Sequence, residues 1–254
     1  MLFRTFFATA SILASGQVIA VTASSIVFAD NLGSAVLYTA DREQPGPGVI
    51  VVHEWWGLND YAKDRAKQLA ESGYTAIAVD MYGHGKVASH PTDANAFMEA
   101  AFDEPELMNA RFAAAHQALL QTGTVSAEHV YGVGYCFGGA VVLNQARQGA
   151  ELAGVASFHG SLGTDNPARA GDISARVLVA TGGADPMVPA EQVSDFVLEM
   201  ANAEVEYSLL SFPGVLHSFT SPKADRIAEE HGMPVGYDEH ADKASWSALM
   251  DFIR

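Results

Sequence analysis

Short runs of apolar and β-branched residues recur along this chain, and longer stretches in which apolar residues follow helical spacing separate them. The runs predicted as strands cover 49–53, 74–80, 129–135, 154–158, 176–181 and 205–212. The stretches predicted as helices cover 59–73, 91–121 with a break at 103–105, 140–149, 188–203 and 237–254. Strands that alternate with helices predict an α/β fold with a doubly wound, mostly parallel sheet flanked by helices.

Two further β-prone runs, 25–28 and 34–38, precede this alternation. The residues at 30–33 between them read Asp-Asn-Leu-Gly, which is typical of a hairpin turn. We expect the hairpin to form the edge of the sheet.

The first residues have a different character from the rest of the chain. After Arg4 the sequence is apolar and rich in small residues through Ala23, and the next charge is at Asp30. This pattern resembles a secretory leader, so we predict a signal peptide at 1–24 and an exported protein, periplasmic or secreted. We expect the cut between 20 and 29, preferably near 20–23, although Val27-Phe28-Ala29 also qualifies as a cleavage site. An uncleaved membrane anchor and a misassigned start codon are the alternatives. No later stretch is long and apolar enough to span a bilayer.

Composition narrows the possible partners and cofactors. The remaining 25–254 suits one α/β domain, and the net charge of −16 disfavours nucleic acid and anionic lipid surfaces as partners. One cysteine excludes an internal disulfide framework. The nine histidines and the cysteine show no Cys-x-x-Cys or His-x-x-x-His spacing, so we expect neither a metal nor a cofactor. The oligomeric state stays open.

The one cysteine lies where a predicted strand turns into a predicted helix. Gly134-Tyr135-Cys136-Phe137-Gly138 fits the pattern Gly-x-nucleophile-x-Gly, in which glycines permit a strained turn that exposes the central side chain. The N-terminus of the following helix favours a thiolate at this position. A buried, inert cysteine in a glycine-rich turn is the alternative.

Other chemically informative residues follow predicted strands. Asp185 and His217 come after two later strands, so the chain order is nucleophile, acid, histidine. A turn-forming acid before Pro186 and a core histidine are their structural alternatives. Glu54, Trp55 and Trp56 follow the strand at 49–53, at the sheet edge where open α/β sheets bind ligands, although they could simply pack or be solvated.

The motifs together resemble the dienelactone hydrolase family of the α/β-hydrolase superfamily, in which a cysteine replaces the usual serine. The resemblance covers the chain from about residue 25 to its end. It is carried by His53-Glu54-Trp55-Trp56-Gly57-Leu58-Asn59, Gly134-Tyr135-Cys136-Phe137-Gly138-Gly139, Gly183-Ala184-Asp185-Pro186 and His217-Ser218-Phe219.

The resemblance implies an α/β-hydrolase fold and a hydrolase of carboxylic esters or lactones. Cys136 would be the nucleophile, His217 its base, and Asp185 the group that holds the imidazole tautomer. Attack on an ester would give an acyl-thioester, which water activated by His217 would release as an acid.

The resemblance also implies roles for the loop after the first central strand. Glu54 matches the family's glutamate, which contacts the thiol in the resting enzyme and shifts when substrate arrives. The backbone N–H groups of Trp55 and Phe137 match the two donors of the oxyanion hole.

The chain departs from the family where dienelactone-cleaving enzymes carry carboxylate-binding arginines. The first region reads Met81-Tyr82-Gly83-His84 here, and the second position is Ser221. We therefore expect a largely neutral small-molecule ester or lactone as substrate, with Trp55, Trp56 and Tyr82 in an apolar pocket wall. His84 or Lys86 could supply one positive charge for a monoanionic substrate.

Two other functions remain open. A thioesterase or a peptidase would use the same triad, and a non-catalytic binding protein could keep the fold without turnover. The complete set of nucleophile, base and acid favours an enzyme over the binding protein.

Overall fold

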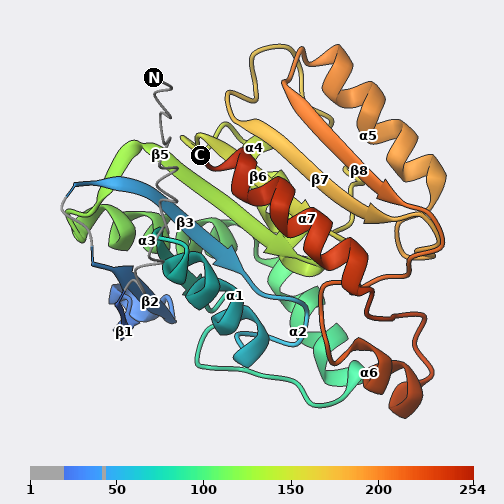
Figure 1. Ribbon diagram of the computed structural model, residues 1–254, viewed down its shortest axis with the longest axis horizontal. Coiled ribbons are helices and arrows are strands. Elements are labelled where there is room, and N and C mark those ends of the chain that lie inside the picture. Colours follow the sequence, from blue (N-terminus) through green and yellow to red (C-terminus); the bar gives the residue numbers. More distant parts are fainter. Residues whose placement is uncertain (1–19, 42–43) are drawn as a thin grey trace, which may run out of the picture.

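The computed structural model describes residues 20–41 and 44–254, and within these ranges eight strands form one sheet with helices on both faces (Figure 1). The strands are β1 (Val21–Val27), β2 (Ser34–Ala40), β3 (Gly46–Val52), β4 (Thr75–Val79), β5 (Val125–Tyr135), β6 (Gly154–Phe158), β7 (Arg176–Gly182) and β8 (Tyr207–Phe212). Their order across the sheet is β1-β2-β4-β3-β5-β6-β7-β8. The pairs β1–β2 and β2–β4 are antiparallel and the other pairs are parallel. This confirms the mostly parallel, doubly wound sheet.

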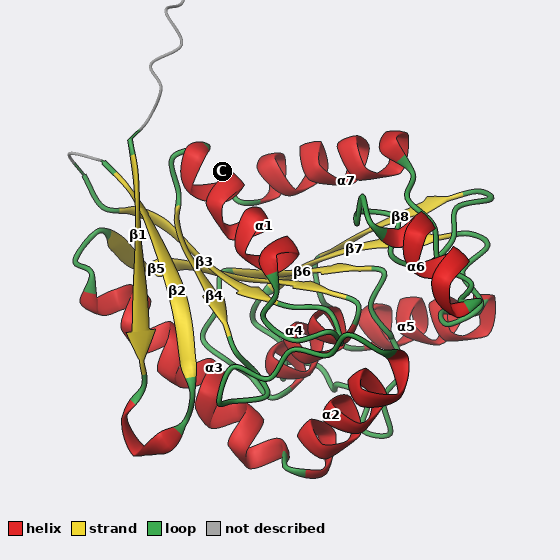
Figure 2. Ribbon diagram, turned by 90° about the horizontal axis from the view of Figure 1, so that it is seen from below, coloured by secondary structure: helices red, strands yellow, loops and turns green. Residues whose placement is uncertain are grey.

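The helices divide between the two faces of the sheet. They are α1 (Asp60–Glu71), α2 (Pro91–Asp103), α3 (Pro105–Gln121), α4 (Phe137–Arg147), α5 (Ala190–Asn202), α6 (Ala224–His231) and α7 (Glu239–Phe252). Helices α1 and α7 cover one face, and α3, α4 and α5 cover the other (Figure 2).

Successive side chains of each central strand point alternately into the two cores on either face of the sheet. In β3, Val49 and Val51 belong to the core under α1 and α7, whereas Ile50 and Val52 belong to the core under α3, α4 and α5. All four side chains are fully buried. A strand covered on both faces therefore reads as one continuous apolar run.

The hairpin and the helix ends follow the predicted local chemistry. Strands β1 and β2 pair with Ile26 opposite Ala35, and the turn contains a short 3₁₀ helix, Ala29–Asn31. The side chain of Asn59 accepts a hydrogen bond from the Ala62 N–H and caps α1, as expected. The break between α2 and α3 lies at Glu104, before Pro105.

The predicted leader lies almost entirely outside the described residues, which begin at residue 20. Strand β1 begins at Val21, so a cut after Ala23 would remove its first residues, whereas a cut after Ala20 would leave it whole. No helix in the described ranges has the length and apolar character needed to cross a membrane.

Helix α6 is the element that the sequence pattern did not predict. It is short and mostly polar, and its apolar Ile227 packs with Met233 against Trp56. Its position therefore depends on tertiary contacts, and it lies beside the site described next.

Candidate active site

Cys136 occupies a strained turn between β5 and α4. Its φ of 52° and ψ of −114° lie where residues with a side chain are rarely found. A Cβ atom at Gly134 would overlap the backbone of Gly138, so the turn requires glycine there. The Cys136 N–H donates to the Phe158 carbonyl at 2.9 Å, which ties the turn to the end of β6. The sequence therefore forms a strained turn between strand and helix at Cys136, whose side chain is half-buried.

The structure brings His217 and Asp185 together at the same sheet edge. The two atoms Nδ1 of His217 and Oδ2 of Asp185 are 2.7 Å apart, and each residue is only 4% exposed. The other carboxylate oxygen of Asp185 accepts a hydrogen bond from the Met187 N–H at 2.8 Å. With both oxygens engaged, the carboxylate orients the imidazole and leaves Nε2 directed elsewhere.

The ionisation of His217 is coupled to the thiol. Burial lowers the pKa of His217, but the charge of Cys136 and the hydrogen bond with Asp185 outweigh burial and raise this pKa to about 10. No nitrogen or oxygen atom in the described part of the chain is hydrogen bonded to Nε2. These surroundings therefore favour the imidazolium form of His217.

Glu54 lies at the end of β3, 3% exposed, and its Oε1 accepts a hydrogen bond from the Ser218 hydroxyl at 3.0 Å. The hydrogen bonds of the described residues include this one and none between Glu54 and Cys136. Burial raises the pKa of Glu54, and the charge of His217, the Ser218 hydrogen bond and the charge of Arg65 oppose that rise. In this state Glu54 is thus tied to the histidine loop rather than to the thiol.

Two backbone donors lie on either side of the elbow. Phe137 is the first residue of α4, and neither its N–H nor that of Trp55 has a hydrogen-bond acceptor within the described residues. The Gly138 N–H donates to the His53 carbonyl at 3.1 Å, so the start of α4 is held against the end of β3. This arrangement suits two donors that converge on one oxyanion.

His53 supports this arrangement, a role that the sequence analysis missed. Its Nε2 accepts a hydrogen bond from the Met81 N–H at 3.1 Å, so its Nδ1 donates to the Glu54 carbonyl at 2.6 Å. Burial lowers the pKa of His53 to about 4, which keeps the ring neutral. The apolar run that ends at His53 contained no signal for this role.

An apolar pocket of about 230 Å³ opens above the cysteine. No lysine, arginine, aspartate or glutamate side chain lines it within the described residues. Its lining residues are Trp55, Trp56, Met98, Phe102, Cys136, Phe137, Ala140, Ser161, Met187, Val188, His217, Ser218, Ile227, Met233 and Val235. The pocket thus brings Cys136 and His217 together among aromatic and aliphatic side chains.

The pocket corrects two expectations about its walls. Trp55 and Trp56 line it as expected, but Tyr82 and His84 line a separate recess with Lys86. The Tyr82 hydroxyl donates to the Trp55 carbonyl at 2.9 Å, which places the ring beneath the loop. His84 is exposed on a left-handed turn with φ of 57°.

Several wall residues were missed because their spacing is that of core residues. Met98 and Phe102 lie on α2, Ile227 lies on α6, and Met187 and Met233 lie on loops. Apolar residues at helical spacing carry no signal that separates a pocket wall from a core. The described residues contain no group of three or more His, Cys, Asp or Glu that could hold a metal ion.

Comparisons with known proteins show which family and fold this chain shares. Protein usf from Aquifex pyrophilus is 26% identical over 221 residues, which span 85% of this chain and 91% of that protein. A solved dienelactone hydrolase-like promiscuous phosphotriesterase from metagenomic libraries is 33% identical with a TM-score of 0.83, and the solved structure named m3DLH is 32% identical with a TM-score of 0.85. Each match covers 92% of this chain and 98% of the other. The fold is therefore the α/β-hydrolase fold. Because the dienelactone hydrolase family model matches residues 34–254, the chain belongs to the dienelactone hydrolase family.

Proposed function

We propose that this protein hydrolyses neutral carboxylic esters or lactones through a Cys136–His217–Asp185 triad. The observation that carries the proposal is the pairing of His217 with Asp185 beside Cys136 at an apolar pocket. Membership of the dienelactone hydrolase family supports a carboxylic ester or lactone hydrolase independently of that geometry.

The reaction divides into two steps that share the same groups. The Cys136 thiolate attacks the acyl carbon, and the N–H groups of Trp55 and Phe137 bind the resulting oxyanion. The His217 imidazolium gives its Nε2 proton to the leaving alkoxide, and an alcohol departs from the acyl-thioester. Water then transfers a proton to Nε2 as it attacks the thioester, and collapse releases the carboxylic acid and the thiolate.

The pocket lining defines the class of substrate. A substrate carboxylate placed in it would lose water without gaining a lysine or arginine partner. Ser221, at one of the family's arginine positions, lines a different recess with Lys223 and Arg226. An uncharged acyl or lactone group therefore fits this pocket better than a dicarboxylate does.

A matched pair of aryl esters tests the substrate class. p-Nitrophenyl butyrate and p-nitrophenyl hemisuccinate share a leaving group and differ mainly in the terminal carboxylate. We expect kcat/KM for the neutral ester to be about tenfold higher or more, a transition-state preference of about 1.4 kcal/mol. A preference for the hemisuccinate or for a dienelactone would contradict the neutral substrate class.

Substitutions at the triad test the chemistry. Cys136→Ala and His217→Ala should each lower turnover by roughly 10³ or more with the folded structure retained by circular dichroism. Rapid quenching of the wild-type reaction should show the acyl mass on the peptide that contains Cys136. Wild-type activity in Cys136→Ala would exclude the covalent route. Thioesters, peptides and a neutral phosphotriester complete the substrate screen, and turnover of these alone would support the alternative activities.

A further inference from the structure

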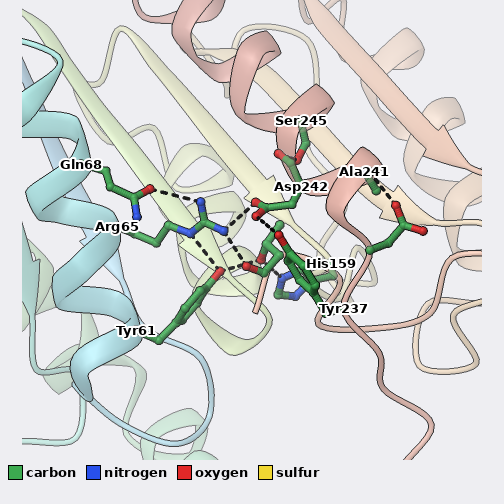
Figure 3. Close-up of polar contacts among 10 residues, drawn as sticks. Tyr61, Arg65, Gln68, His159, Tyr237, Ala241, Asp242 and Ser245 are labelled. Atoms are coloured by element: carbon green, nitrogen blue, oxygen red, sulfur yellow. Dashed lines mark hydrogen bonds and ion pairs between the residues drawn. The ribbon is translucent and has the colours of Figure 1, made fainter. Parts of the chain in front are cut away.

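Behind His217 lies a buried group of polar residues that the reaction described above does not use. Arg65 of α1 and Asp242 of α7 form an ion pair, with Nη2 and Oδ1 2.6 Å apart, on the α1 and α7 side of the sheet (Figure 3). Arg65 is 6% exposed, and the same Nη2 donates to the Thr220 carbonyl at 2.5 Å. The ion pair thus holds the loop that carries His217.

The hydrogen bonds continue from Arg65 to a second histidine. Arg65 Nε lies 3.4 Å from the Tyr61 hydroxyl, the Tyr61 hydroxyl lies 2.6 Å from Thr220 Oγ1, and Thr220 Oγ1 lies 2.7 Å from His159 Nε2. Thr220 and His159 are 1% and 0% exposed. Tyr61, Thr220 and His159 are called the buried chain below.

Arg65 fixes one end of the buried chain, because arginine can only donate and the Tyr61 oxygen therefore accepts from Nε. Tyr61 and Thr220 share the next hydrogen bond, in which either hydroxyl can be the donor. Thr220 Oγ1 and His159 Nε2 share the last one, and its direction follows the tautomer of His159. Burial and the positive charges of His217 and Arg65 lower the pKa of His159 well below its usual range, so this ring stays neutral.

His159 contacts the catalytic histidine directly. The His159 and His217 rings meet edge to face with centroids 5.1 Å apart. His159 follows β6 with φ of 43°, and its N–H donates to the Ala180 carbonyl at the end of β7 at 2.8 Å. A bulky residue held in a left-handed conformation is costly, and such residues gather where geometry matters for function.

The hydrogen bond to Asp185 alone does not determine the position of His217. A ring held at one nitrogen can still swing about that bond, and its neighbour Ser218 has φ of 56° in the loop between β8 and α6. The His159 ring restricts this movement from one side, and the Arg65 bond to the Thr220 carbonyl restricts the loop. We propose that the buried chain, with His159 at its end, positions the His217 imidazole for the reaction, and that His159 is a positioning residue.

This inference rests on the proposed function, but one of its tests needs no turnover. The ionisable groups that surround His217 are Cys136, Asp185, Glu54 and His159, with Arg65 at longer range. If the buried chain holds the imidazole against Cys136 and Asp185, then loosening it should lower the pH at which His217 titrates. Nitrogen-15 NMR of histidine-labelled protein measures this pH directly, even if no ester is turned over.

Two variants break the buried chain, a third serves as a control, and a fourth tests for rescue. His159→Leu removes the hydrogen-bonding nitrogen at nearly the same volume, and Tyr61→Phe removes the hydroxyl that links Arg65 to Thr220. Tyr237→Phe makes the same chemical change on the other side of Asp242, where the Tyr237 hydroxyl lies 3.3 Å from Oδ2. A fourth variant, His159→Gln, restores a hydrogen-bonding partner for the Thr220 hydroxyl.

We expect His159→Leu to lower kcat for a neutral ester by about 10- to 100-fold with little change in KM. It should also lower the pH at which His217 titrates by roughly half a unit or more. Tyr61→Phe should act in the same direction, the double variant should lose less than the two effects combined, and His159→Gln should recover part of kcat. Tyr237→Phe should match the wild type. A His217 titration unchanged in both His159→Leu and Tyr61→Phe would overturn the proposal, as would an equal loss of kcat in Tyr61→Phe and Tyr237→Phe. If His159→Leu does not fold, Tyr61→Phe against Tyr237→Phe decides the question.

Discussion

Removal of the Cys136 thiol should lower the proton affinity of His217, so the proposed thiolate–imidazolium pair of Cys136 and His217 can be measured directly. The pKa of His217 is about 10, against an ordinary value of 6.5. That difference corresponds to about 5 kcal/mol of preference for the imidazolium. Burial acts in the opposite direction, and Cys136 is the largest of the causes that raise the pKa. In Cys136→Ala the largest of these causes is gone while burial remains, so we expect the pKa to fall by roughly two units or more, about 3 kcal/mol.

Long-range proton–nitrogen spectra of histidine-labelled protein follow each ring through neutral and alkaline pH. His53 is an internal reference, because burial rather than the thiol sets its pKa of about 4, and its resonances should not respond to the substitution. Asp185→Asn should also lower the His217 pKa, since it removes the other partner that raises it. Titration of His217 near 10 in both the wild type and Cys136→Ala would refute the thiolate–imidazolium pair.

Three further outcomes test the elbow, a buried ion pair and the leader. Gly134→Ala should abolish activity and lower Tm, because the added methyl group overlaps the Gly138 backbone. Arg147→Met should lower the free energy of unfolding in urea by about 3–5 kcal/mol, because it leaves the Glu199 carboxylate buried without its bidentate partner. Turnover per folded molecule should stay unchanged. A loss of less than about 1 kcal/mol would count against a tight Arg147–Glu199 pair. Intact mass of exported protein should show cleavage between residues 20 and 29, and retention of Met1 would contradict the leader.

The fold was predictable because each central strand is buried on both faces and each helix follows its own spacing. The run around Ile50 and the helix capped by Asn59 needed only local pattern and capping chemistry. Helix α6 was missed because its eight residues are largely polar, and packing of Ile227 against Trp56 holds it in place. Tertiary contacts of this kind leave no periodic signal.

The candidate site also has residues that could be predicted from the sequence and residues that could not. Cys136, Asp185 and His217 each follow a predicted strand, and parallel strands bring such residues to one edge, so their proximity could be inferred. The pocket walls could not, because Met98 and Phe102 have the spacing of core residues. His159 could not be predicted either, since a histidine after a short strand gives no sign of what its ring will contact.

The place of β8 at the free edge of the sheet has a consequence for thermal inactivation. This strand pairs only with β7 in the described sheet, it is partly exposed, and the loop that follows it carries His217. Cys136, by contrast, follows β5 in the middle of the sheet. Local opening at an exposed edge requires less free energy than global unfolding. Heating should therefore separate the histidine from the cysteine while most of the sheet persists, so that enzymatic half-life falls at temperatures below the calorimetric transition.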